Sequence, residues 1–592
     1  MVCSLKHDSG LIQGRPENII VHVDDQITAF CTTFAKLRKD FDSGISLTTA
    51  LLLSRKASES VDITGVCPYT FRYLTWSHDL HLERLLRVLR PEDMDEYNRT
   101  PCLENTRLNV MNDLVDWIAD DSSEGKNVLW LYGLAGTGKS TVATTIAQVM
   151  RSLHRLGAFF FFNRTIPQRN FATLIRTLAY QLAIFDARFG AAISRILENM
   201  ENIAEMPLEF QFKILLSAST LGSVEWSGGP IVLIIDALDE CENKANRKIL
   251  MQVLTKGFSD LPSFIRIMVI SRPELDIQRA LESHSNVRPY PLDIDSVTNE
   301  NVLTFIRHRL EEIRTKEGYL GGWPGDVKIN SLANLAGGLF VWASTACSYI
   351  ERGFDPNRRL SEILDKQRLD VSSGPNEALD SLYTTVLYSA GPWDDPSFRY
   401  NCCNILGVIL CARLPLPCSV IDALLALPQD SSSWKSVSRL RSVLDVKEAE
   451  PIRILHPSFF DYLSERRNDK PWFIDLEHHN RELALRCIHL LDKELRENIC
   501  DMTLPYLNRK HTLSEAISYS CKFWMEHTCL SDASNATEDI IHQTYVFLVR
   551  HLLHWMEALA ILNSHDHTIR SVRDLIEWLQ VCPPIYTMSA FP

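Results

Sequence analysis

One stretch of eight residues constrains the fold of this 592-residue chain more than any other, "GLAGTGKS" from Gly133 to Ser140. It follows the apolar run "NVLWLY" and precedes "TVATTIAQVM", so it lies between an expected strand and an expected helix. Its three glycines permit backbone conformations that turn successive N–H groups inward around phosphates. Lys139 supplies a charge for the β and γ phosphates, Ser140 a hydroxyl for Mg²⁺, and the helix N-terminus its dipole. The complete pattern predicts a phosphate-binding loop.

A carboxylate is expected beside this loop. In "IVLIIDALDEC" the side chain of Asp236 stands at the C-terminal end of an apolar strand, where open parallel sheets bind ligands, so it is expected to hold Mg²⁺ directly or through water. Asp239 and Glu240 follow within one turn, and either can orient an attacking water. The alternative for these acids is an ordinary helix N-terminus, which the helix dipole favours. The sequence does not choose between Asp239 and Glu240.

A third site residue is expected from "FIRIMVISRPE". Arg272 follows an apolar strand, and from there its guanidinium can reach the γ-phosphate. A solvated surface arginine is the alternative. The N-K-x-D pattern that marks guanine sites is absent, because "NKAN" (243–246) ends in Asn and does not close a strand. The predicted ligands are therefore ATP or ADP with Mg²⁺.

The order of elements predicts a multidomain α/β plus α protein. Continuous apolar strands at "GAFFFFN" (157–163), "PIVLIIDAL" (230–238) and "FIRIMVIS" (264–271) alternate with helical patterns, which indicates a parallel sheet with helices on both faces. After about residue 295 the pattern is helical, and residues 400–465 show three helices and a hairpin around "KEAEPIRIL", the outline of a winged helix. The predicted domains are an N-terminal helical region (1–100), a nucleotide-binding domain (101–295), a helical domain (296–398), a winged helix-like domain (399–470) and a C-terminal helical region (471–592).

Composition excludes some classes of partner. Acidic residues outnumber basic ones 74 to 61, the net charge is −13, and no long Lys/Arg block occurs, so nucleic acid and anionic membranes are not expected partners. The 15 cysteines form no C-x-x-C pair and the N-terminus has no signal-peptide pattern, which predicts a reduced, cytoplasmic protein. The longest apolar runs (337–350 and 402–414) are shorter than the roughly 18 to 20 residues that span a bilayer.

The three motifs together resemble a known family. "GLAGTGKS", "IVLIIDALDEC" and "IRIMVISRPE" are similar to the NACHT NTPase module of the STAND class, the switch ATPases of NOD-like receptors. With the lead-in "TPCLENTRLNVMNDLVDWI", the chain is most similar to fungal NACHT proteins, whose module is also labelled nephrocystin-3-like. The resemblance implies a signalling switch in which slow ATP hydrolysis controls a change from a closed ADP form to a homo-oligomer. It also implies unknown protein partners for the N- and C-terminal helical regions.

Two other functions remain as alternatives. A turnover P-loop ATPase or kinase would need an acceptor-binding lid or a second catalytic half, and neither is visible in the sequence. A scaffold or adaptor with a structurally bound nucleotide is the other.

The resemblance assigns further roles by position. Thr106 and Arg107 match the segment that lies along the adenine in relatives, and His456 in "RILHPSFFDYL" matches a winged-helix histidine that touches the ADP β-phosphate. A histidine satisfied at the end of a hairpin is the alternative for His456. Phe340 stands where many relatives have the proline of Gly-x-Pro, and packing between helices is expected for it rather than stacking on adenine. The expected nucleotide-binding set in the loop is Gly133, Leu134, Ala135, Gly136, Thr137, Gly138, Lys139, Ser140 and Thr141.

Other candidate sites weaken when their context is considered. Zinc ligands of the usual types are present at Cys521, His527, Cys529, His551 and His554. These residues lie in expected helices of apolar periodicity and form no C-x-x-C pair, so packing between helices is expected rather than metal binding. The stretch "SHDHTIR" (564–570) is expected to be a polar loop between helices. Ser458 has no G-x-S-x-G context, so hydrolase chemistry has no support.

Overall fold

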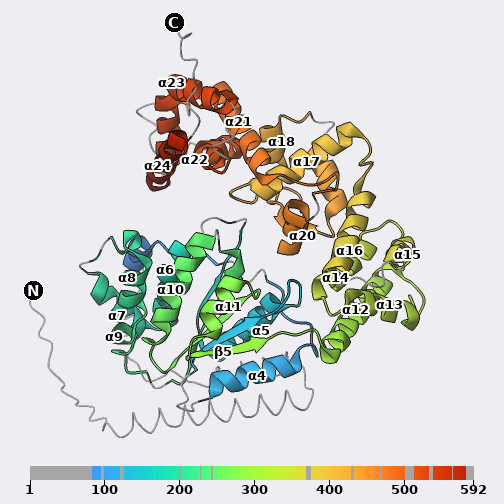
Figure 1. Ribbon diagram of the computed structural model, residues 1–592, viewed down its shortest axis with the longest axis horizontal. Coiled ribbons are helices and arrows are strands. Elements are labelled where there is room, and N and C mark those ends of the chain that lie inside the picture. The colour runs from blue at the N-terminus through green and yellow to red at the C-terminus, as the bar shows by residue number, and fades with distance from the viewer. Residues whose placement is uncertain are drawn as a thin grey trace, which may run out of the picture. The chain divides into compact units, whose positions relative to one another are not determined.

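The computed structural model describes most of the chain beyond residue 82. The described ranges are 83–94, 99–120, 126–164, 166, 169–198, 200, 202–226, 228–241, 244–367, 375–428, 432–466, 468–499, 513–531, 538–562 and 565–581. Most of the N-terminal helical region predicted for 1–100 therefore lies outside the described residues. The chain divides into two compact units, one up to Phe305 and one from Ile306 onward, with residues 165–167 counted in the second (Figure 1).

A parallel sheet forms the centre of the first unit, as predicted, and it has five strands. Its strands are β1 (Val128–Tyr132), β2 (Leu156–Phe161), β3 (Ile231–Asp236), β4 (Ile265–Ser271) and β5 (Val287–Pro291), in the order β2-β3-β4-β1-β5. Every residue of β3 and β4 is buried because helices cover both faces, and this explains their unbroken apolar sequences. The parallel register brings the ends of β1, β3 and β4 to one edge of the sheet, where the loop and the acidic motif follow.

Helices connect and cover these strands (Figure 1). Among the described residues, a short helical segment over 83–89 comes first. The labelled helices of this unit are α4 (Leu108–Ala119), α5 (Lys139–Ser152), α6 (Phe171–Phe185), α7 (Ala187–Leu197), α8 (Leu208–Leu215), α9 (Ala218–Leu221), α10 (Lys244–Phe258) and α11 (Leu275–Glu282). Helix α12 (Ser296–Glu317) begins in the first unit and ends in the second.

Strand β5 was not expected from the sequence. Its residues "VRPYP" contain Pro289 and Pro291, which lack a backbone N–H and are typical of edge positions rather than central strands. It is the edge strand beside β1, with Val128 opposite Val287. The prolines are tolerated because β5 has a neighbour on one side only.

The second unit is mostly helical. Its helices are α13 (Asp326–Ala336), α14 (Phe340–Glu351), α15 (Pro356–Gln367), α16 (Pro375–Ala390), α17 (Pro396–Cys411), α18 (Cys418–Leu425), α19 (Ser433–Val437), α20 (Pro457–Asp461), α21 (Leu476–Glu494), α22 (Glu515–Cys529), α23 (Glu538–Ile561) and α24 (His565–Val581). Strands β6 (Leu444–Asp445) and β7 (Arg453–Ile454) pair antiparallel and form the hairpin expected around "KEAEPIRIL". The helices and hairpin between α17 and α20 follow the predicted order, and their grouping as a winged helix-like domain remains a prediction.

The prediction of a polar loop at 564–570 was wrong. Helix α24 already begins at His565, and its later residues Leu575 and Trp578 are buried. A run of polar residues is compatible with the first turns of a helix as well as with a loop, so polarity alone did not distinguish them. Among the described helices, none combines the length and apolarity needed to cross a membrane.

Candidate nucleotide-binding site

The loop between β1 and α5 has the geometry that the glycine pattern predicts. Gly136 and Gly138 adopt positive φ angles of 79° and 93°, a region that favours glycine. A Cβ on Gly133 would lie 2.8 Å from the carbonyl oxygen of Leu292, so a side chain there would push the loop away from the chain that follows β5. All nine predicted loop residues, Gly133, Leu134, Ala135, Gly136, Thr137, Gly138, Lys139, Ser140 and Thr141, lie in this connection or in the first turn of α5.

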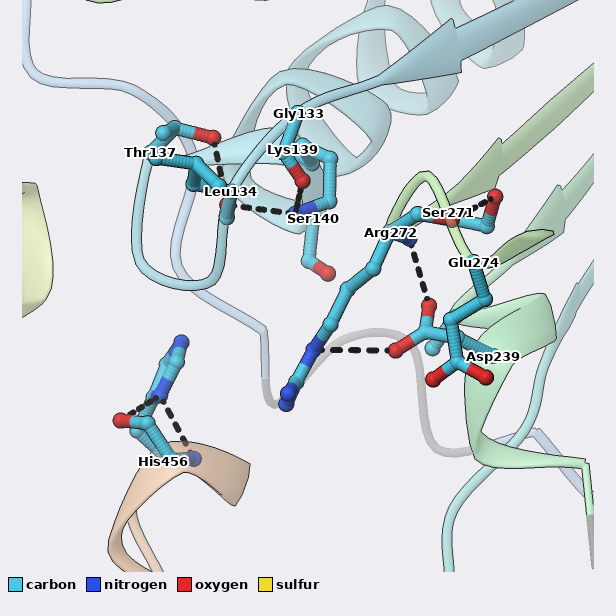
Figure 2. A network of polar contacts seen from close by, with 12 residues as sticks. Gly133, Leu134, Thr137, Lys139, Ser140, Asp239, Ser271, Arg272, Glu274 and His456 are labelled. Carbon is cyan, nitrogen blue, oxygen red and sulfur yellow. Dashed lines mark hydrogen bonds and ion pairs between the residues drawn. The ribbon is translucent and has the colours of Figure 1, made fainter. Parts of the chain in front are cut away.

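The side chain of Lys139 folds back over the loop. Its Nζ donates to the carbonyl oxygens of Gly133 at 2.9 Å and Leu134 at 2.8 Å (Figure 2). Burial lowers the pKa of Lys139 to about 8, although the nearby Asp239 carboxylate acts in the opposite direction. Within the described part of the chain, the hydrogen-bond partners of the ammonium group are these neutral carbonyl oxygens, and a phosphate oxygen would be a stronger acceptor.

Asp236, at the end of β3, is placed beside the loop as predicted. The residue is fully buried, and its Oδ1 accepts hydrogen bonds from Ser140 Oγ at 3.2 Å and from the backbone N–H of Ala237 at 2.8 Å. Ser140 and Asp236 thus lie close enough to act on one cation. A hydroxyl and a carboxylate are oxygen donors of the kind that Mg²⁺ prefers.

Arg99 is a site residue that the sequence reasoning missed. Its Nη2 lies 2.6 Å from Oδ2 of Asp236, and its guanidinium lies 4.4 Å from the ring centroid of Phe161 in β2. Arg99 stands 137 residues before Asp236 in a stretch without a motif, so no local signal pointed to this ion pair.

Asp239 and Arg272 hold one another at the same edge of the sheet. Oδ1 of Asp239 accepts the backbone N–H of Arg272 at 2.9 Å, and Oδ2 lies 3.1 Å from its Nε (Figure 2). Asp239 is buried in the short turn Leu238–Glu240 that follows β3. The alternative of a simply solvated Arg272 does not fit, because the guanidinium is tied to a buried carboxylate.

Arg247 of α10 supports this turn and was also missed. Its Nη1 donates to the carbonyl oxygen of Asp239 at 3.1 Å, while its other nitrogens pair with Glu274 at 2.5 Å and Asp276 at 2.7 Å. Arg247 therefore joins the acidic turn to the chain just after β4. Its position in the first turn of α10 gave no sequence signal, because many helices carry arginines.

Glu240 differs from its neighbour Asp239. Burial, together with the nearby Asp239 charge, raises the pKa of Glu240 to about 8. A carboxyl group with such a pKa is suited to accept a proton near neutral pH.

Arg107 lies next to the loop, but its contacts are structural. Its Nη2 donates to the carbonyl oxygen of Thr137 at 2.8 Å and its Nη1 to Oγ1 of Thr298 at 2.8 Å. Its backbone N–H donates to Oδ1 of Asn301 at 3.0 Å, so Arg107 joins the loop to the first turns of α12. Thr106 donates its hydroxyl to the carbonyl oxygen of Leu103 at 2.6 Å. The adenine contact expected for both residues remains a prediction.

In the second unit, His456 caps a helix. Its Nδ1 accepts the backbone N–H of Ser458 at 3.1 Å and lies 2.7 Å from Oγ of Ser458, which in turn lies 2.8 Å from the Tyr383 hydroxyl. This is the arrangement of a histidine satisfied at the end of a hairpin, the alternative considered above. Phe340 is the first residue of α14 and is half-buried. The nucleotide contacts inferred for His456 and Phe340 remain predictions.

The cysteine and histidine residues of the C-terminal helices form no metal-binding group among the described residues. Both ring nitrogens of buried His527 have protein partners, Tyr519 Oη at 2.7 Å and Oδ1 of Asn480 at 2.8 Å. Nδ1 of His551 lies 3.2 Å from Nδ1 of His554. His527 therefore links α22 to α21 by packing and hydrogen bonding.

Comparison with known proteins agrees with this geometry. Residues 110–272 match the family model described as Nephrocystin 3, N-terminal. The vegetative incompatibility protein HET-E-1 of Podospora anserina is 24% identical over 515 residues, which are 80% of this chain and 36% of that protein. The chain thus spans about a third of the length of this relative.

A solved structure, that of Drosophila ORC bound to GC-rich DNA and Cdc6, aligns with 89% of this chain and 78% of its own at 12% identity. Its TM-score of 0.22 is too low to bear on fold or function. The family match and the site geometry fall on the same residues, from α4 to the end of β4. Residues 110–272 are therefore similar to the nephrocystin-3 N-terminal module, and the chain is similar to a fungal incompatibility protein.

Proposed function

We propose that this chain is a nucleotide switch of the STAND and NOD-like receptor type, in which bound ADP keeps a closed form and ATP permits homo-oligomerisation. The observation that carries the proposal is the meeting of Lys139, Ser140 and Asp236 at one edge of the sheet. The residues present fit a magnesium nucleotide. Two glycines of positive φ open the loop, a lysine of lowered pKa lies over it, and a hydroxyl and a carboxylate lie 3.2 Å apart beside it.

Each group has a role in this proposal. Bound Mg²⁺ would neutralise charge on the β and γ phosphates, held by Ser140 and Asp236. Lys139 would exchange the carbonyl oxygens of Gly133 and Leu134 for phosphate oxygens. Arg272 would sense the γ-phosphate, with Asp239 fixing its orientation.

Glu240 is the residue we assign to orient the attacking water, because Asp239 is already occupied by Arg272. The water would add to the γ-phosphorus as the bond to the bridging oxygen breaks, and its proton would pass to the Glu240 carboxylate. Because burial raises its pKa to about 8, this carboxyl group is mostly protonated at pH 7. This favours slow hydrolysis and therefore a switch rather than a turnover enzyme.

The test of nucleotide binding is Lys139→Ala in the full chain, with the exposed Lys126→Ala as the matched control. Removing the charge over the loop is expected to weaken ADP binding at least about a hundredfold, whereas the control should bind like the wild type. Titration calorimetry measures both. Wild-type affinity in Lys139→Ala would refute the proposed loop function.

His456 is proposed to hold the closed form by contacting the nucleotide, as the family resemblance implies. His456→Leu is expected to shift the ADP-loaded protein from monomer toward oligomer in light scattering. The substitution also removes a helix cap, so Ser458→Ala, which removes the hydroxyl beside the ring and keeps the histidine, is the control. Assembly in neither variant, or equal assembly in both, would leave His456 with a capping role only.

Slow hydrolysis separates the switch from the other readings. A steady turnover of tens per second would contradict the switch and favour a turnover ATPase. Tight ADP with no hydrolysis and no change of assembly would favour a scaffold with structural nucleotide.

A further inference from the structure

Two segments before the proposed NTPase module, residues 83–94 and 99–107, contact the first unit near the site, and together they are called the strap here. Hydrogen bonds fix it at both ends. Nη1 of Arg176 in α6 donates to the carbonyl oxygen of Leu89 at 2.6 Å, and the N–H of Cys102 donates to Oγ1 of Thr145 in α5 at 2.8 Å. Arg99 stands between Leu89 and Cys102 in the sequence, and its side chain pairs with Asp236.

The charge of Asp236 is neutralised by this arginine. Oδ1 of Asp236 accepts the bonds from Ser140 and Ala237, and Oδ2 takes the ion pair with Arg99 at 2.6 Å. The carboxylate is fully buried, so little solvent screens the two charges from one another. A divalent cation approaching Asp236 would therefore meet a carboxylate that already has a positive partner.

The guanidinium of Arg99 is incompletely satisfied in this position. Its Nη1 is buried and has no hydrogen-bond partner within the described part of the chain. A buried donor without a partner costs free energy, which offsets part of what the ion pair contributes. Arg99 is thus held at Asp236 less firmly than its short ion pair suggests.

We propose that Arg99 is a resident cation that competes with Mg²⁺ for Asp236, so that binding of a magnesium nucleotide releases Arg99 and loosens the chain from Arg99 to its contact at Cys102. This inference rests on the proposed nucleotide site. It adds to that site a positioning residue from outside the matched family segment, and it couples the metal to the chain that precedes the module.

The test compares the Mg²⁺ requirement for retention of a fluorescent ADP analogue by the full chain and its variants. Arg99→Gln removes the competing charge, so the half-saturating Mg²⁺ concentration is expected to fall about tenfold. Arg99→Lys keeps the charge and should stay within about twofold of the wild type. Arg169→Gln is the matched control, because its guanidinium also lies over the Phe161 ring, at 4.2 Å, while it donates to the carbonyl oxygen of Asp93.

An unchanged or increased Mg²⁺ requirement in Arg99→Gln would overturn this inference and leave the proposed function standing. Failure of the wild type to bind the analogue at any Mg²⁺ concentration would overturn both. A second measurement needs no variant. Hydrogen exchange in wild-type peptides that cover residues 99–102 should become faster when Mg²⁺ is added to the ADP-bound protein, and unchanged or slower exchange there would overturn the release of Arg99.

Discussion

Glu240 gives a residue-scale prediction with two readouts. Its pKa of about 8 lies above its ordinary value, so the folded protein binds this proton more tightly than the unfolded chain does. The stability that it contributes is complete below about pH 4.5 and is lost as the pH rises through 8. Glu240→Gln stays neutral at every pH in this range. The melting temperature of Glu240→Gln minus that of the wild type should therefore rise by several degrees as the pH is raised from 5 to 8.5.

The same variant tests the proposed chemistry. Glu240→Gln should retain ADP and ATP but lose hydrolysis, because an amide cannot accept the proton of the attacking water. Glu225→Gln is a control, since it is an exposed carboxyl group elsewhere in the first unit. A melting temperature that follows the wild type across this pH range would contradict the raised pKa, and unchanged hydrolysis would reassign the role to Asp239.

Arg107 gives a prediction for the contact between elements. The residue is buried and joins the loop carbonyl of Thr137 to Thr298 in α12. Arg107→Ala leaves those acceptors without their donor and opens a cavity, so the free energy of unfolding of the first unit should fall by about 2–4 kcal/mol. Arg288→Ala, an exposed arginine on β5, should change it by less than about 0.5 kcal/mol.

Urea denaturation followed by tryptophan fluorescence measures both arginine variants. Buried Trp130 in β1 stacks on Tyr132 and hydrogen-bonds Ser271, so it reports on the sheet beside the loop. Equal loss of stability in the two variants would show that the links to Thr137 and Thr298 contribute nothing specific.

Among the elements, sequence reasoning succeeded where the signal was local. Strands β2, β3 and β4 are predicted by their unbroken apolar runs. The loop between β1 and α5 is predicted by its fixed glycine spacing. Strand β5 was missed because its prolines oppose a strand assignment and only its edge position permits them.

The parts of the site that were missed depend on contacts between distant residues. Asp236, Asp239 and Arg272 follow strands and were found by that position. Arg99 and Arg247 act through ion pairs to partners far along the chain, and arginines are common enough on surfaces that sequence alone does not single them out. Our proposed choice of Glu240 over Asp239 likewise rests on a distant contact, the ion pair between Asp239 and Arg272.

For the whole molecule, the two units should respond to pH in opposite directions. Burial lowers the pKa of His527 in the second unit to about 3, so its stability contribution is present above about pH 6.5 and is lost as the pH falls toward 3. The first unit loses the Glu240 contribution as the pH rises toward 8. Calorimetric scans at pH 5 and pH 8.5 should therefore show two transitions whose separation changes with pH.

Variants assign these transitions. Glu240→Gln should move only the first unit's transition at pH 8.5, and His527→Gln should reduce the acid sensitivity of the other. A single transition with the same midpoint shift in both variants would contradict independent responses.

Helix α12 has a practical consequence for dissecting the chain. Its early residues Thr298 and Asn301 are partners of Arg107, while its later turns belong to the second unit. A fragment that stops at residue 295 would lack both partners, and the guanidinium of Arg107, which is buried in the full chain, would be exposed to solvent. A recombinant fragment of the first unit should include the strap and extend through Glu317, so that the strap and the whole of α12 are expressed with the sheet that they contact.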